Sequence, residues 1–180
     1  MSKTVKSDDK RGRADLELFI LALIGRGLTT PYDLRTSVGL SPGATIPAFS
    51  RLEKAGFVVK GKAEARGRLE YELSPRGKKH LETSWRALLD PSRTGDLDVV
   101  LRVASLALLM GEKKQVVASY LSDASKERQA KAKHTRIAVA PKLRDAGLYP
   151  WLRQFGEPAR AASESAILRK IAGLVKKAQS

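Results

Sequence analysis

Apolar and polar positions along the first half of the chain predict three helices. The segment Asp15–Ile24 is apolar on nearly all sides, which indicates a helix at the centre of a core, capped by its first residue. A short helix is expected from Tyr32 to about Val38, since Thr29 or Thr30 can cap it. A third helix is expected over residues 41–55, where serine and proline open the segment and a glycine follows it.

After the third helix the pattern changes to that of a β-hairpin. Residues 57–59 are apolar and partly β-branched, and residues 69–73 alternate apolar with acidic side chains, so each segment predicts a strand. The segment 60–68 between them holds four basic residues and two glycines, and we expect an exposed loop. A new helix is expected from Ser74-Pro75 to about Leu89. A helix-turn-helix followed at once by a hairpin is the winged helix-turn-helix layout, in which one helix fills the DNA major groove.

The second half of the chain predicts helices alone. Residues 97–110 indicate a buried helix, and residues 112–139 a longer, more polar one. Residues 140–158 hold three prolines and two glycines and are expected to form a loop with an aromatic patch, before a last helix over 158–178. The expected fold class is therefore mostly α with a small β-hairpin.

The last helix carries an apolar stripe with helical spacing. Because no later sequence is there to cover this stripe, we expect it to pack against a second copy of the chain, with packing inside one chain as the alternative. A symmetric homodimer would present two recognition helices to a palindromic site. The residues expected in this dimer interface are Ile167, Leu168, Ile171, Leu174 and Val175.

Composition and charge narrow the class of partner. The 180 residues have room for one domain or two small ones, and 42% hydrophobic residues suffice for a packed core. The expected organisation is a disordered segment over 1–13, a DNA-binding domain over 14–90, and a helical dimerisation domain, with a candidate effector site, over 91–180. A formal net charge of +15 points to a polyanion such as double-stranded DNA, and a merely soluble basic surface is the alternative.

The sequence argues against catalysis and metal binding. The chain has no cysteine, and its two histidines lie far apart, so we expect no disulfide, no metal site and no cofactor. Phosphate-binding glycine loops, nucleophile elbows and paired catalytic carboxylates are not evident, so we expect no enzyme. No secretory signal is visible and the longest apolar run is too short to span a membrane, which favours the cytoplasm.

Three segments carry a family likeness. They read L-F-I-L-A-L-I-G-R-G-L-T-T-P-Y-D-L (18–34), S-P-G-A-T-I-P-A-F-S-R-L-E-K-A-G-F-V (41–58) and G-R-L-E-Y-E-L-S-P-R-G (67–77). In this combination the chain resembles the PadR family of bacterial transcription regulators. The resemblance implies a winged helix-turn-helix, a dimer formed through the C-terminal helices, and a repressor that a small apolar or aromatic effector relieves. The chain departs from the family pattern at Pro31, where a glycine is usual, and at Ile46, where a tyrosine is usual.

A helical wheel over residues 44–55 separates a core side from a candidate DNA-reading side. Arginine suits guanine, serine suits bases or phosphate, and Ile46 or Pro47 could meet a thymine methyl group. The missing N–H of Pro47 predicts an irregular first turn or a late helix start. A simply solvated helix face is the alternative. The side opposite the core holds Ile46, Pro47, Ser50 and Lys54, with Arg51 on its flank.

Further contacts are expected around this helix. Ser41 is expected to cap it, and could also help to bind a phosphate, while Tyr32 could either bond to phosphate or fill the core with its ring. Arg66 and Arg68 flank the glycine at the wing tip, which suits the DNA backbone or the minor groove. The residues considered for an effector pocket are Trp85 and Trp151, with core packing as the stronger alternative.

The function expected is a sequence-specific, DNA-binding transcription regulator, as a homodimeric repressor on a palindromic operator. Two alternatives stay open: a winged-helix module that binds another protein, and a nucleic-acid binder without sequence preference. Salt dependence and competitor DNA would separate the last of these from a regulator.

Overall fold

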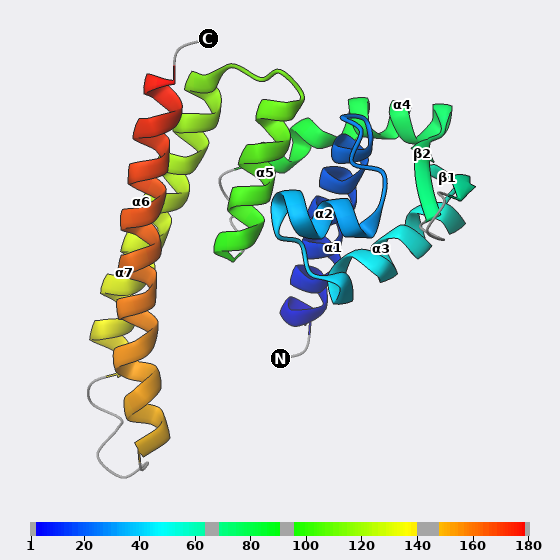
Figure 1. Cartoon of the computed structure of the whole chain (residues 1–180). Coiled ribbons are helices and arrows are strands. Elements are labelled where there is room, and N and C mark those ends of the chain that lie inside the picture. The colour runs from blue at the N-terminus through cyan, green and yellow to red at the C-terminus, as the bar shows by residue number, and fades with distance from the viewer. Residues whose placement is uncertain (1–2, 64–68, 91–95, 140–147, 179–180) are drawn as a thin grey trace. The chain divides into compact units, whose positions relative to one another are not determined.

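The computed structural model describes the backbone of residues 3–63, 69–90, 96–139 and 148–178, and the side chains of residues 14–61, 69–90, 96–133 and 156–178. The chain is mostly helical with one antiparallel β-hairpin, as its sequence predicted (Figure 1). It divides into two compact units. The first consists of Met1–Leu89 with Leu101–Gly111, and the second of Asp90–Val100 with Glu112–Ser180.

The first unit begins with three helices: α1 (Lys3–Ile24), α2 (Pro31–Val38) and α3 (Pro42–Lys54). Thr30 caps α2 in a capping box, because its hydroxyl accepts a hydrogen bond from the backbone N–H of Asp33 while the Asp33 carboxylate accepts one from the N–H of Thr30. Gly39 ends α2 with a φ of 71°, a left-handed conformation that suits glycine. The short turn that follows leads directly into α3, so these elements form a helix-turn-helix.

The core of this unit gathers apolar side chains from every element around α1. Ile20 and Leu21 of α1 are fully buried, as are Leu34 of α2 and Phe49 of α3. The ring of Phe49 packs on the ring of Tyr71, with 4.4 Å between the centroids. The predicted position of α1 at the centre of the core is therefore confirmed.

The hairpin consists of β1 (Val58–Ala63) and β2 (Leu69–Leu73), paired antiparallel with Val58 opposite Leu73. The N–H of Tyr71 donates to the carbonyl of Thr29 at 3.0 Å, which ties β2 to the turn before α2. The strand β1 is longer than predicted. Residues 60–63 belong to the strand instead of the loop: Lys60 pairs with Tyr71 and Ala63 with Leu69, with a register irregularity between the two pairs. Glycine and lysine on an exposed strand edge do not prevent such pairing.

The hairpin ends where α4 (Pro75–Ser84) begins, and α4 continues into a short 3-10 helix, η1 (Trp85–Leu89). The Ser74 hydroxyl accepts from the N–H of Gly77 at 2.9 Å and donates to the carbonyl of Gly56 at 2.6 Å. The N–H of Ser74 donates to the carbonyl of Phe57. Ser74 therefore joins the start of α4 to the turn after α3. We call the residues Gly56, Phe57, Ser74 and Gly77 the wing-base clamp.

The N-terminal helix differs from its prediction. It begins at Lys3, whereas residues 1–13 were expected to be disordered and the helix was expected to start at Asp15. The segment contains no proline, and a single glycine costs a helix only about 1 kcal/mol. Asp15 is not a cap but a buried residue that accepts a hydrogen bond from Arg102 Nε at 2.8 Å. Burial raises the pKa of Asp15, although the charge and hydrogen bond of Arg102 act in the opposite direction.

Two further predictions concerning helix starts are wrong. Pro47 lies inside α3, which runs without a late start from Pro42, since Pro47 removes only one backbone hydrogen bond near the first turn. The last helix, α7 (Leu148–Lys177), begins ten residues earlier than expected and contains Pro158. Its early residues were expected to form a loop. The neighbouring α6 packs along α7, and this contact outweighs the lost hydrogen bond.

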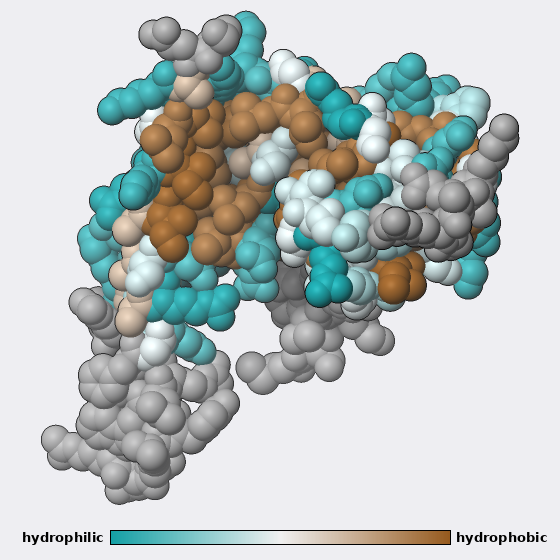
Figure 2. Space-filling view, in the orientation of Figure 1, coloured by the Kyte–Doolittle hydropathy of each residue, from teal (hydrophilic) through white to brown (hydrophobic). Residues whose placement is uncertain are grey.

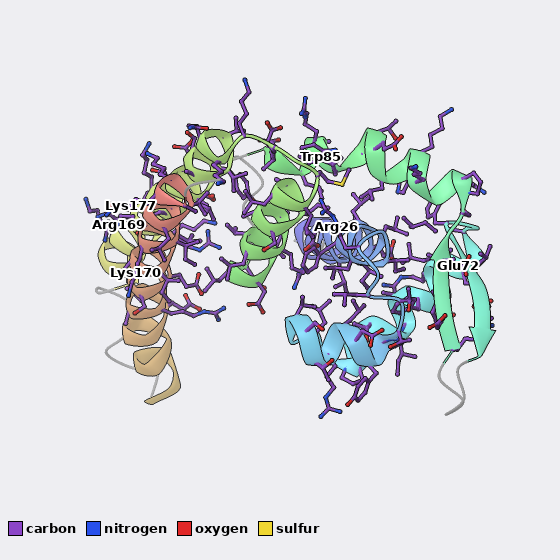
Figure 3. The ribbon with its side chains drawn as sticks, turned by 45° about the horizontal axis from the view of Figure 1, so that its top comes forward. Arg26, Glu72, Trp85, Arg169, Lys170 and Lys177 are labelled. Atoms are coloured by element: carbon purple, nitrogen blue, oxygen red, sulfur yellow. The ribbon has the colours of Figure 1, made fainter. Side chains whose placement is uncertain are left out.

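The second unit is built on α6 (Lys114–Val139) and α7, which lie side by side as a helical hairpin (Figure 1). The helix α5 (Leu97–Leu109) has its first residues in this unit and its later residues in the first. Within the later part, Leu109 accepts a hydrogen bond from Arg26, labelled in Figure 3, at 2.6 Å. Among the described residues, no helix is both long and apolar enough to cross a membrane.

A polar network is buried between α6 and α7. The hydroxyls of Ser125 and Ser165 lie 2.9 Å apart, and the nearly buried Arg128 donates to Glu164 at 2.9 Å. Arg160 donates to the other oxygen of the same carboxylate. Burial alone would raise the pKa of Glu164, but the hydrogen bonds and charges of Arg160 and Arg128 lower it below its usual value.

We expect Gly77→Ala to destabilise the first unit strongly. A Cβ at this position would lie 1.9 Å from the carbonyl oxygen of Phe57, and backbone atoms cannot give way as a flexible side chain can. The expected loss is about 3 kcal/mol of unfolding free energy or more, measured by urea denaturation. The matched control is Gly43→Ala in α3, where a Cβ meets no atom within 4 Å. Equal stability of the two variants would contradict the clamp.

We expect Glu164→Gln to destabilise the α6–α7 hairpin in a pH-dependent manner. At pH 7 the variant removes the carboxylate charge that pairs with the nearly buried Arg128 and with Arg160, at a cost of about 3 kcal/mol. The lowered pKa means that this contribution is present above the ordinary glutamate value of 4.5 and is lost as the pH falls through the lower folded value. Urea unfolding of the wild-type protein and of Glu164→Gln, at pH 7 and in steps below pH 4.5, measures this contribution to the free energy of unfolding. A stability difference independent of pH would contradict this account.

Candidate nucleic-acid interface

The helix α3 has one face in the core and the opposite face in solvent. Ala48, Phe49 and Leu52 are buried, as the helical wheel predicted. The solvent face carries apolar, hydroxyl and cationic groups within three turns, and the apolar Ile46 is 58% exposed. Such a mixture can meet thymine methyl groups, base edges and phosphates. The exposed candidate DNA-reading residues are Ile46, Pro47, Ser50 and Lys54.

The two flanks of α3 are held by ion pairs to neighbouring elements. On one flank Arg51 Nε donates to Glu17 Oε1 of α1 at 2.5 Å. On the other flank Lys60 Nζ of β1 lies 2.8 Å from Glu53 Oε1. The hydrogen bond and the charge of Glu53 raise the pKa of Lys60. The sequence analysis did not identify Glu17, Glu53 or Lys60, because their pairing depends on contacts between elements that are distant in sequence.

The helix α2 and the turn after it add polar groups to the surroundings of α3. Tyr32 is 50% exposed, so its ring does not fill the core, and the phosphate-binding alternative remains a prediction. Arg35, which the sequence analysis did not single out, is exposed on the same helix. Ser41 occupies the N-cap position of α3, but its hydroxyl makes no capping hydrogen bond, so that expectation is wrong. The hydroxyl of Thr45 instead donates to the Ser41 carbonyl at 3.1 Å.

The wing reaches past the described residues. The strands β1 and β2 build its proximal part. Glu72, which is labelled in Figure 3, belongs to β2. Arg66 and Arg68, the residues predicted to contact DNA from the wing tip, lie outside the described residues. Their role remains a prediction.

Two tryptophans were predicted as candidates for an effector pocket, with core packing as the stronger alternative. Trp85 is buried in η1, with the guanidinium of Arg86 5.1 Å from its ring centroid, and therefore belongs to the packed interior of the first unit (Figure 3). The side chain of Trp151 lies outside the described residues. The effector remains a prediction.

The apolar stripe of α7 divides into a buried and an exposed part. Leu168 is fully buried within the chain, and its expected place in a dimer interface stays a prediction. Leu174 is 59% exposed and Ile167 is also exposed, with Ile171 and Val175 of intermediate exposure. Figure 2 shows apolar side chains gathered over the C-terminal part of α7. The dimer expected to cover the exposed part of the stripe remains a prediction.

No protein-family model matches the chain, and no curated protein matches it. Among solved structures, the chain is similar to Bacillus subtilis PadR in complex with operator DNA, at 16% sequence identity and a TM-score of 0.35, over 89% of this chain and 98% of that one. Similarity at this level does not establish a family.

Proposed function

We propose that the chain is a sequence-specific, DNA-binding transcription regulator in which α3 enters the major groove. The observation that carries the proposal is the two-faced α3 inside a helix-turn-helix with an adjoining β-hairpin. A helix with an exposed face of this kind can enter the major groove, which admits an α-helix. The net charge of +15 favours a polyanion as the partner.

Each exposed group on α3 has a role in the proposal. Lys54 is suited to a phosphate or a guanine, and Ser50 to a base edge or a phosphate. Ile46 replaces the hydrogen-bonding tyrosine of the PadR pattern and would instead contact a thymine methyl group. Arg66 and Arg68 of the wing tip, with Tyr32 and Ser41, would contact the backbone beside this groove. These contacts would fix the register of α3 on the duplex without reading its sequence.

We further propose that the regulator acts as a homodimer and as a repressor. The exposed residues Ile167 and Leu174 of α7 lie two helical turns apart, and covering them requires a partner surface. A second copy would supply the same stripe in a two-fold interface and would place two copies of α3 on a palindromic site. A dimer bound over a promoter would exclude polymerase. The protein would then work beside the chromosome in the cytoplasm.

Selection of binding sites from a random duplex library, followed by anisotropy titration at several salt concentrations, tests the proposal. We expect the selected duplex to bind at least about a thousandfold more tightly than a scrambled one. Ser50→Ala with Lys54→Ala should remove most of this preference, because both side chains face the groove. The matched control is Ser119→Ala with Lys133→Ala, at exposed positions of α6.

Other outcomes of this titration contradict the proposal in different ways. Equal, strongly salt-dependent binding to both duplexes would identify a nucleic-acid binder without sequence preference. Binding to neither duplex, by a protein that is folded, would favour the protein-interaction module. Retention of the full preference by the Ser50 and Lys54 variant would remove α3 from the interface.

Sedimentation equilibrium tests the homodimer. We expect Ile167→Ser with Leu174→Ser to raise the dimer dissociation constant by about ten-thousandfold or more. The symmetric interface would lose both side chains from each copy, and each side chain buried on association contributes about 1.5 kcal/mol or more. Val59→Ser is the control, because Val59 is a similarly exposed apolar residue of the hairpin. A wild-type monomer at all concentrations, or a variant dimer of unchanged strength, would contradict the interface.

A further inference from the structure

The ion pair between Arg51 and Glu17 links a candidate base reader to a fixed acidic residue. The two residues are 34 positions apart, and their side chains retain exposed fractions of 40% for Arg51 and 26% for Glu17. Glu17 is held in place because its neighbours Leu16 and Leu18 are buried in the core. Arg51 is therefore anchored to a rigid part of the first unit while its side chain still reaches solvent.

The atoms used in this contact leave the reading end of the guanidinium available. Glu17 accepts a hydrogen bond from Nε, on the inner edge of the group. Within the described part of the chain, the side chain of Arg51 makes no other hydrogen bond or ion pair. The two Nη atoms can therefore donate together to O6 and N7 of a guanine, which is the most common specific contact of arginine with DNA.

A held arginine has two advantages over a free one. Ordering a long side chain on binding costs conformational entropy, and an existing hydrogen bond at Nε removes part of that cost. The fixed orientation of the guanidinium also favours the coplanar acceptors O6 and N7 of a guanine. A phosphate oxygen can be approached from many directions and gains less from a fixed donor. In exchange, the negative charge of Glu17 weakens attraction to any DNA backbone.

The ion pair on the opposite flank has a different arrangement. There the acid, Glu53, belongs to α3 itself, and the cation, Lys60, belongs to the hairpin. That pair joins α3 to β1 and holds no arginine in place. Glu53→Gln is therefore a suitable control, because it removes a negative charge from α3 but leaves Arg51 anchored to Glu17.

We propose that Glu17 is a positioning residue for sequence recognition: it holds Arg51 by Nε so that the Nη end reads one guanine in each half of the DNA site. The inference rests on the proposed function, because it requires α3 to lie in the major groove. It predicts that removal of the Glu17 charge lowers discrimination between bases while general affinity for DNA stays equal or rises. A residue needed only for folding would lower both.

The test uses the duplex selected by the wild-type protein, with each guanine replaced in turn by 7-deazaguanine, which lacks the N7 acceptor. We expect one substitution per half-site to weaken wild-type binding by about tenfold or more. Arg51→Ala should be insensitive to that same substitution. Glu17→Gln, which has nearly the same shape, should show less than a third of the wild-type effect, and Glu53→Gln should retain it in full.

Each result decides the inference. A full 7-deazaguanine effect in Glu17→Gln would overturn it, as would an Arg51→Ala protein that keeps the wild-type sensitivity. Tighter and more selective binding by Glu17→Gln would also overturn it, because Glu17 would then withhold Arg51 from DNA. Circular dichroism melting of every variant identifies a loss of fold, and Glu17→Asp, which keeps the charge, should retain part of the effect. If the wild-type protein selects no sequence, the proposed function itself fails, which is a distinguishable result.

Discussion

The wing-base clamp is the constraint on which the rest of the first unit depends. The hydroxyl of Ser74 bonds at once to the carbonyl of Gly56, where α3 has ended, and to the N–H of Gly77, where α4 has begun. Gly77 must be a glycine because its α-carbon approaches the carbonyl of Phe57 too closely for any side chain. Phe57 is covered in turn by the stacked ring of His80, at 4.3 Å between centroids. These contacts tie the base of the hairpin to the C-terminal end of α3, beside the candidate reading helix.

Besides the wing-base clamp, two ion pairs and a buried apolar face orient α3. The core fixes which side of the helix faces solvent, and the pairs Arg51–Glu17 and Glu53–Lys60 fix its flanks against α1 and β1. Exposed ion pairs contribute little to stability, on the order of 0–1 kcal/mol, so their value lies in geometry. In the second unit the nearly buried Arg128–Glu164 pair acts differently, because a charge left there without a partner would be costly.

The sequence was sufficient to predict the elements but not how side chains pair across them. Local signals identified α2, through Thr30 and Gly39, and the buried face of α3 through helical spacing. Contacts over long distances in sequence were missed: Asp15 was interpreted as a cap because its partner Arg102 is 87 residues away. Likewise, the stripe of α7 indicated an apolar face, but the spacing of its residues alone could not show that Leu168 is buried while Leu174 is exposed. The prediction that the last helix starts at Pro158 was also wrong. Proline usually breaks a helix, but α7 continues through Pro158 because it packs against α6.

The central claim is that the solvent face of α3 lies in the DNA major groove, and directed cleavage tests it most directly. Because the chain has no cysteine, Ser50→Cys introduces a single thiol in the middle of this face, to which an iron chelate that generates hydroxyl radicals can be coupled. The account predicts strand cleavage confined to a few base pairs in each half of the selected site, with the two centres about one helical turn apart or a multiple of it. The same chelate on Ser119→Cys of α6 should not reproduce this pattern. DNA that is bound but not cleaved from position 50 would contradict the account.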